Sequence, residues 1–505
     1  MTRKRRNRLG GLVAAAFAVA ASVSVPAGAV TPSLATKVAR VTGATPSGET
    51  LPNPNHTDTA YQVNGTDLGI MWDAGGGTVM VAFGDTYGTG WTGPGAGGPD
   101  WRSNVLGIST NTDPQNGLAF STMIQNTSGH AKELLSSLKN NKEATVIPTA
   151  GITIGTRSYI HFMSVNRWGT AGSWVTNYSE IAYSDDGGQN WTKDANTQWS
   201  ASSHFAQAAF IRNGGYLYMF GTPAGRFGNV YLARVVEANV LSKTSYEYWD
   251  GNAWQTNNEG AAVPIVNAPV GELSVQYNSY FGRYLMSYLD ENRASLVLRD
   301  AGSLTGTWTG ERVLARGSTY PSLYGAFIHP WFNTSTDLYF TMAQRDPYNV
   351  FFMHSTLSSD SLGENMVSDP GFEDQTTNSV TAPWRVSGTG GIDRGLGNGH
   401  SGANNAWLRS TKGTNTVTQT IAVAPNHSYQ LTGWVRTATN VSNGTFGVRA
   451  VNGGAVIQQT AFGAKASYTQ LTVTFNSGNN SLVDVYGGFT ASVDSWVQLD
   501  DVSLQ

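Results

Sequence analysis

Asp67-Leu-Gly-Ile-Met-Trp-Asp73, Gly75-Gly-Gly77 and Val79-Met-Val-Ala-Phe-Gly-Asp85-Thr-Tyr-Gly88 follow one another in a single stretch of the chain. Two apolar runs separated by glycines predict two short strands joined by a tight turn. In an antiparallel hairpin, the start of one strand lies at the same edge as the end of the next. We therefore expect Asp67 and Asp85 to meet at one edge of a sheet. The alternative is that Asp85-Thr-Tyr-Gly88 only forms a turn, because Asp and Gly favour turns.

A module of three or more strands recurs along residues 61–358. Each copy has an inner strand, an aromatic-rich middle strand and a third strand, in that order. The middle strands are Met80–Gly84, Tyr159–Met163, Tyr216–Phe220, Tyr284–Tyr288 and Leu338–Met342. Five copies of roughly 65 residues each predict a five-bladed β-propeller. A sandwich would use similar strands but would explain five triplets in the same order less readily.

The composition is that of an all-β protein. The chain has 59 Gly, 15 Trp, 21 Tyr and 19 Phe, and only 13% of its residues are charged. Glycines suit tight turns and aromatic residues favour strands, while flat rings also suit the apolar faces of sugars. The only segment that predicts a helix is His130–Asn140, because Leu134, Leu135 and Leu138 recur at helical spacing.

The first 29 residues predict a secretory signal peptide. A basic segment, Arg3–Arg8, precedes an apolar run, Leu12–Val25, and the small residues Ala27-Gly28-Ala29. Its removal leaves 26 basic against 34 acidic residues, a formal charge of −8. A mildly acidic chain without a basic tract argues against nucleic acid or a membrane surface as a partner. We expect a secreted, extracellular monomer without disulfides, because cysteine is absent.

The remaining domain boundaries follow changes in amino-acid composition along the chain. Residues 30–60 predict an irregular N-terminal arm, residues 359–364 a linker, and residues 365–505 a β-sandwich, or jelly roll. The opening Gly371-Phe-Glu373 and the closing Asp500-Asp-Val502 resemble the ends of β-sandwich carbohydrate-binding modules. That resemblance implies a structural calcium held by Glu373 with Asp500 or Asp501, since carboxylates are hard oxygen ligands. The alternative is that these acids only satisfy backbone groups at strand ends.

The sandwich also contains several large aromatic residues that are candidates for stacking on sugars, and at least half of them are expected in the core. They are Trp384, Trp407, Trp434, Tyr486 and Trp496.

Ser184-Asp-Asp-Gly-Gly-Gln-Asn-Trp191 matches the pattern called the Asp box. It resembles a hairpin of sialidase-like propellers, in which Ser and Asp tie the turn and Trp plugs between strands. We interpret it as structural and exclude Asp186 from the active site.

Polar residues at the mouth of the predicted channel are the candidates for chemistry. Metal-ligand, serine-nucleophile and phosphate-binding motifs are absent, so no cofactor is expected for catalysis. Paired carboxylates remain, and these are what glycoside hydrolysis requires, one protonated and one ionised. Asp67 and Asp85 are the predicted pair, and which one holds the proton stays open, although the buried strand before Asp85 favours that residue. Candidates for substrate binding are Arg102, Asn104, Glu180, His204, Gln207, Glu272 and His329.

The motifs around Asp67, Phe83-Gly-Asp85-Thr-Tyr-Gly88 and Arg102-Ser-Asn104 resemble a bacterial propeller family long catalogued as a domain of unknown function. The resemblance spans about residues 45–358. Members of that family are endo-D-arabinanases that cut the D-arabinan of mycobacterial arabinogalactan and lipoarabinomannan. The resemblance implies the same activity and substrate here, with Asp67 and Asp85 as two essential aspartates.

Two alternatives keep the propeller. In the first, the substrate is L-arabinan or another furanoside, and Glu272 acts as the acid beside two other carboxylates. In the second, the propeller binds glycan without cutting it, which two crowded aspartates argue against.

Overall fold

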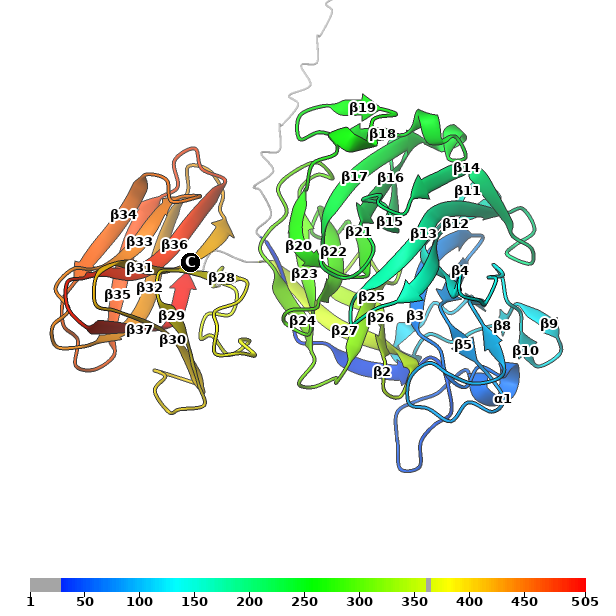
Figure 1. The fold of residues 1–505 in the computed structure, drawn as a ribbon, viewed down its shortest axis with the longest axis horizontal. Helices are drawn as coiled ribbons and strands as arrows, with labels where there is room; N and C mark the ends of the chain where they lie inside the picture. The colour runs from blue at the N-terminus through cyan, green and yellow to red at the C-terminus, as the bar shows by residue number, and fades with distance from the viewer. Residues whose placement is uncertain (1–28, 360–364) are drawn as a thin grey trace, which may run out of the picture.

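The computed structural model describes residues 29–359 and 365–505, which form a five-bladed β-propeller followed by a β-sandwich (Figure 1). The expected signal peptide and most of the expected linker lie outside these residues. Inner strands of neighbouring blades contact one another in sequence, and the fifth contacts the first, so the ring is closed. The all-β prediction and the fivefold count are confirmed.

The first four blades each use antiparallel strands in chain order, and blade 1 has a short two-stranded insertion before its third strand. Blade 1 comprises β3 (Leu68–Gly75), β4 (Thr78–Phe83), β7 (Val105–Ser109) and β8 (Thr122–Met123). Blade 2 comprises β11 (Thr145–Ile154), β12 (Arg157–Trp168), β13 (Trp174–Ser184) and β14 (Thr192–Ser200). Blade 3 comprises β15 (Gln207–Asn213), β16 (Tyr216–Thr222), β17 (Gly228–Val236), β18 (Glu247–Trp249) and β19 (Trp254–Thr256), with β20 (Val266–Val270) also paired to β17. Blade 4 comprises β21 (Leu273–Asn278), β22 (Arg283–Asp290), β23 (Ser295–Ala301) and β24 (Arg312–Arg316).

Blade 5 joins the two ends of the propeller sequence. It comprises β25 (Leu323–Ile328), β26 (Asp337–Gln344) and β27 (Asn349–Ser359), together with β1 (Val30–Pro32) and β2 (Thr36–Arg40). Both N-terminal strands pair with β27, for example Val30 with Ser359. The prediction that residues 30–60 form an irregular arm is therefore wrong for its first part, because β1 and β2 close the ring.

Short elements decorate the propeller. They are α1 (Thr57–Tyr61), β5 (Thr86–Tyr87), β6 (Trp101–Arg102), β9 (Gln125–Thr127), β10 (His130–Ala131) and the 3-10 turns η1 (Pro114–Asn116), η2 (Glu237–Asn239), η3 (Lys243–Ser245) and η4 (Glu259–Ala261).

The helix predicted over His130–Asn140 does not form. The side-chain oxygen of Asn104 accepts hydrogen bonds from the backbone N–H groups of Leu134 and Leu135, at 3.1 and 2.8 Å. These amides are therefore not available to a helical ladder. Leu134 and Leu135 are nevertheless buried, so their apolar spacing reflects packing against the blades.

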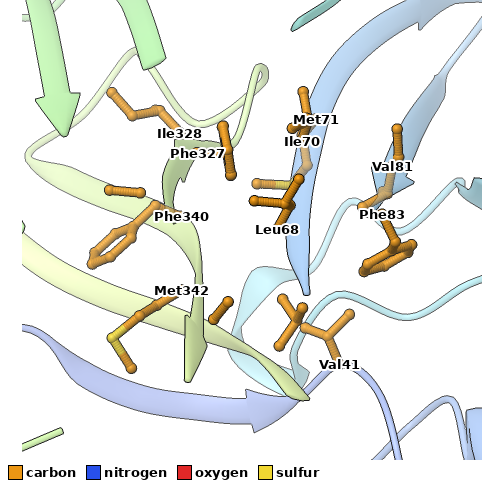
Figure 2. Close-up of a cluster of buried hydrophobic side chains, with 14 of the residues drawn as sticks. Val41, Leu68, Ile70, Met71, Val81, Phe83, Phe327, Ile328, Phe340 and Met342 are labelled. Carbon is orange, nitrogen blue, oxygen red and sulfur yellow. The ribbon is translucent and has the colours of Figure 1, made fainter. Parts of the chain in front are cut away.

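The apolar core between blades 5 and 1 fixes the mouth of the propeller (Figure 2). Leu68 and Ile70 of β3 pack in one cluster with Phe327 of β25 and Phe340 of β26. Phe83 and Phe340 are fully buried. Each such side chain contributes roughly 1.5–3 kcal/mol through the water it excludes. This core therefore fixes the start of β3 and the end of β4. Asp67 comes directly before β3, and Asp85 follows β4 after one glycine.

The C-terminal domain consists of two five-stranded sheets packed around their own apolar core. The first contains β28 (Trp384–Ser387), β31 (Gly413–Ala422), β36 (Leu482–Ala491), β33 (Gly444–Ala450) and β34 (Val456–Phe462). The second contains β29 (Gly390–Arg394), β30 (Asn404–Ser410), β37 (Ser495–Leu504), β32 (Ser428–Thr437) and β35 (Thr469–Asn476). Asp374 of this domain pairs with Arg293 and Arg316 of blade 4, which joins the two domains.

Candidate active site

A cavity of about 700 Å³ opens at one end of the propeller axis. All five blades contribute to its wall. Four of the predicted site residues line it: Asp67, Asp85, Gln207 and Glu272. Their convergence agrees with the sequence argument, since three of them stand just before or at the start of inner strands and Asp85 follows a middle strand.

A β-bulge at the start of β3 orients Asp67. The register between β3 and β4 shifts between Leu68 and Ile70, and both Leu68 (φ 68°) and Gly69 (φ 90°) have left-handed backbone conformations. A left-handed conformation at a leucine is strained by about 1–3 kcal/mol and persists only where the surroundings impose it. Bulges next to active sites redirect side chains.

Gly84 lets the two aspartates approach. A Cβ atom at this position would collide with Oδ1 of Asp67, so any larger residue would displace that carboxyl. Because Gly84 immediately precedes Asp85, the Phe83-Gly-Asp85 motif has a steric explanation. It places one carboxyl and makes room for the other.

The surroundings of Asp67 favour the protonated form of its carboxyl group. The phenol of Tyr324 donates a hydrogen bond to Oδ2 at 2.9 Å, whereas Oδ1 is buried without a partner among the described residues. Burial, together with the charge of Asp85, raises the pKa of Asp67 to about 7, against the lowering effect of the Tyr324 and Tyr348 phenols. An unpaired buried oxygen favours a protonated carboxyl, because the charged form loses its hydration.

Asp85 is better solvated by protein groups. Its Oδ1 accepts hydrogen bonds from the Thr145 hydroxyl at 2.6 Å and the Trp101 indole at 2.9 Å. Burial raises the pKa of Asp85 to about 6, and these two donors limit the rise. Of the two carboxyls, Asp67 therefore retains its proton to higher pH. This is the opposite of the preference that the buried strand before Asp85 suggested.

Glu272 enters the cavity as part of an ion-pair network. The guanidinium of Arg226 donates to Glu272 Oε1 at 2.9 and 3.0 Å and to Glu291 at 3.1 Å. The same guanidinium lies 4.9 Å from the centre of the Tyr324 ring. The phenol that contacts Asp67 is thus packed against a cation that Glu272 and Glu291 fix in place.

Gln207 lines the cavity but uses its amide N–H groups within the protein. Its Nε2 donates to the backbone oxygen of Gly225 at 2.8 Å. It supports the loop that carries Arg226 into the cavity.

Arg102 and Asn104 lie outside the lining of the cavity. Arg102 donates to the backbone oxygens of Ala131 and Gln62, and Asn104 Nδ2 donates to those of Leu135 and Val146. Both side chains are buried. They organise the loops behind Asp85.

Glu180, His204 and His329 also lie outside the lining of the cavity. Glu180 is inside β13, which begins six residues earlier, and accepts a hydrogen bond from Gln198. His204 stacks on Tyr231, with ring centres 3.8 Å apart. His329 stacks on Phe332, and burial lowers its pKa to about 3, so it is neutral at physiological pH.

Tyr324, Thr145 and Trp101 contact the two aspartates but were not among the site residues predicted from the sequence. Tyr324 stands near the start of the fifth inner strand, a position comparable with those of Asp67 and Glu272. That positional equivalence was the available signal. Thr145 is the first residue of the second inner strand and shared this signal. Trp101 offered none, since its contact to Asp85 depends on a folded loop region.

The expected calcium site stays a prediction, and the structure shows what its acids contact. Among residues 29–359 and 365–505, no three His, Cys, Asp or Glu side chains are placed to hold a metal ion. Glu373 accepts hydrogen bonds from the amides of Ala403 and Asn404, and Asp500 from those of His400 and Ser401. This geometry matches the alternative, in which the acids satisfy backbone groups.

The Asp box has the predicted structural role. Asp186 accepts hydrogen bonds from Ser184 Oγ at 2.8 Å and from the Asn190 amide at 2.9 Å, and Trp191 donates to Gly188. None of these residues lines the cavity.

Within the described parts of the chain, we find no helix with the length and apolar character needed to cross a membrane.

Residues 52–354 match the sequence profile of a family described as a domain of unknown function, DUF4185. The chain belongs to this family. Notoamide biosynthesis cluster protein J of Aspergillus sp. (strain MF297-2) is 30% identical over 293 residues, which cover 54% of this chain and 76% of that protein. Protein J' of the corresponding cluster in Aspergillus versicolor is 30% identical over 289 residues, covering 54% and 78%.

Among solved structures, an exo-β-1,3-galactanase variant from Phanerochaete chrysosporium, in complex with β-1,3-galactotriose, aligns with a TM-score of 0.38 and 11% identity. The alignment covers 93% of this chain and 100% of that chain. The DUF4185 match contains all five inner strands of the propeller and both cavity aspartates.

Proposed function

We propose that this DUF4185 protein is a secreted glycoside hydrolase that cuts internal α-D-arabinofuranosyl linkages of mycobacterial arabinogalactan and lipoarabinomannan. The observation that carries the proposal is the pair Asp67 and Asp85, two buried carboxyls that line one cavity and differ in hydrogen bonding. The choice of sugar rests on the resemblance of the Asp67 and Phe83-Gly-Asp85 motifs to endo-D-arabinanases. Secretion rests on the N-terminal sequence.

In the proposed mechanism, Asp67 is the general acid. Its proton passes to the departing glycosidic oxygen as the bond from that oxygen to the anomeric carbon breaks. Asp85, ionised at the same pH, acts on the anomeric carbon, either directly as a nucleophile or by taking a proton from the attacking water. Tyr324 keeps the carboxyl of Asp67 in place during both steps.

The sandwich is proposed to hold the same polysaccharide. Trp407, Trp434 and Trp496 are partly exposed on β30, β32 and β37 of one sheet, whereas Trp384 is buried in the core. Three large rings on adjacent strands offer a surface for stacking on sugars.

The test is incubation of the protein with mycobacterial arabinogalactan, followed by sizing of the released fragments. Oligosaccharides of several lengths are expected with the unmodified protein and none with the Asp67→Asn/Asp85→Asn double variant. Asp73→Asn is the matched control, because Asp73 is an exposed residue toward the far end of the same strand. Absence of any fragment with the unmodified protein would refute the proposal.

A second candidate keeps the hydrolase and changes the sugar to L-arabinan, with Glu272 as the acid. Its support is that Glu272 lines the cavity with both aspartates. The contact with Arg226 argues against it, since Oε1 of Glu272 already accepts two hydrogen bonds from that guanidinium and is not free to face a substrate. Activity on L-arabinan alone, lost in Glu272→Gln, would establish this candidate in place of the first.

A further inference from the structure

The β12–β13 hairpin extends from blade 2 along the mouth of the cavity. Trp168 and Trp174 face each other at its end, and both line the cavity together with the turn between them. The tip is fastened to blade 3, because the Arg226 amide donates to the Gly172 oxygen at 2.9 Å. A Cβ atom on Gly172 would lie 3.0 Å from the ring of Phe227 and 3.4 Å from the carboxyl carbon of Glu291. The hairpin is therefore packed against two other blades.

Trp168 is unusually exposed for a residue of its size. Half of its surface, 50%, is open to solvent, although tryptophan is highly buried on average. Trp174 supports it in an edge-to-face contact, with ring centres 5.7 Å apart. A flat apolar face is thus presented at the rim of the cavity that contains Asp67 and Asp85, and it is held there by packing.

We propose that Trp168 is a binding platform for a sugar ring of the substrate chain beyond the cleaved linkage, and that it makes the site prefer long chains. The inference rests on the proposed function. Asp85 is buried and Oδ1 of Asp67 is shielded from solvent, whereas Trp168 is exposed at the rim, so one short saccharide would engage the carboxyls alone. A chain cut internally continues past the carboxyls and meets the ring. The occupant is therefore a furanose of the same polysaccharide.

The test compares Trp168→Ala with the unmodified full chain on two substrates: D-arabinan polymer and the shortest arabinan oligosaccharide that the unmodified protein cleaves. We expect KM for the polymer to rise roughly tenfold, the size of effect that one aromatic contact supplies. We expect kcat/KM for the short substrate to stay within twofold and the polymer products to become shorter or more random in length. Trp168→Phe should restore most of the polymer KM, because a flat ring remains.

Tyr280→Ala is the matched control. Tyr280 is 60% exposed in the turn between β21 and β22, at the opposite end of the propeller axis, and does not line the cavity. Binding of soluble arabinan to the Asp67→Asn/Asp85→Asn protein, with and without Trp168→Ala, gives a readout that is independent of turnover. The sandwich is identical in both proteins, so a difference reports on the propeller.

An unchanged polymer KM together with unchanged binding in Trp168→Ala would overturn the inference, while cleavage by the unmodified protein would leave the proposed function standing. Failure of the unmodified protein to cut arabinan would instead refute the proposed function. Weaker binding of arabinan by the Trp168→Ala form of the inactive protein would still support the platform in that case.

Discussion

The protein contains two clusters of acidic residues that look alike in sequence and differ in the fold. Asp67 and Asp85 line a cavity, accept hydrogen bonds only from side chains, and leave one buried oxygen unpaired among the described residues. Glu373 and Asp500 accept backbone amides at strand ends of the sandwich. Burial raises the pKa of Asp500 to about 7, as it does for Asp67. A raised pKa therefore does not separate chemistry from structure; an open cavity and unsatisfied oxygens do.

The largest expected effect is on activity, which should depend on the pair in the cavity and not on the acids of the sandwich. Asp67→Asn and Asp85→Asn should each lower kcat on D-arabinan by about 10²–10⁴-fold, because in the proposed mechanism each removes a group that transfers a proton or acts on the anomeric carbon. Asp500→Asn should leave kcat on a soluble oligosaccharide unchanged. Initial rates of reducing-end release measure all three. A full loss in Asp500→Asn with an intact fold would show that the two clusters are not distinct.

The second effect is on stability and has an unusual sign. The folded pKa of Asp67, about 7, lies above its unfolded value of about 3.9, so the folded state holds this proton more tightly. That contribution to stability is complete below pH 4 and is lost as pH rises through 7. Asp67→Asn removes an ionisable group that is costly to bury at high pH. We expect the variant to be more stable than the unmodified protein at pH 8, by about 2–4 kcal/mol, and little different at pH 4.

Denaturant unfolding of the two proteins at both pH values measures this difference. If Asp67→Asn gains no stability over the unmodified protein between pH 4 and pH 8, the assigned burial of Asp67 is contradicted.

The third effect belongs to the sandwich. Glu373→Gln should lower the stability of this domain by about 1–3 kcal/mol, since a neutral oxygen is a weaker acceptor for the amides of Ala403 and Asn404. Melting with and without added calcium measures it. If calcium raises the melting temperature of the unmodified protein but not that of Glu373→Gln, Glu373 binds a metal ion.

The sequence predicted the pairing of Asp67 with Asp85 because a hairpin is local, and its apolar runs and glycine turn mark where each strand starts and ends. It could not predict the closure of the ring, since β1 pairs with β27 more than 300 residues away. The false helix at His130–Asn140 has a similar cause, because the amides it needed are taken by Asn104. Glu180 and His329 were assigned by their place on strands, and the direction of a side chain there depends on bulges and neighbouring blades that no local pattern records.

The smallest expected effect sharpens the picture of Asp67. Tyr324→Phe removes the phenol that stabilises the ionised carboxyl, so the pKa of Asp67 should rise further. The alkaline limb of the kcat/KM profile should move to higher pH, and kcat should fall about tenfold as the carboxyl loses its anchor. Tyr277→Phe is the control, since Tyr277 lies outside the cavity that Asp67 lines. An alkaline limb that does not shift would show that Tyr324 does not influence the pKa of the group that acts as the acid.

The most direct test of the central claim is the pH dependence of kcat/KM on D-arabinan. With Asp85 ionised above about pH 6 and Asp67 protonated below about pH 7, the profile should be a narrow bell with its maximum between these values. Asp85→Asn should abolish the acidic limb of any residual activity, and Asp67→Asn the alkaline limb. A profile that is flat from pH 5 to 8, or limbs that persist in both variants, would contradict the account of two aspartates that share the work of an acid and its partner.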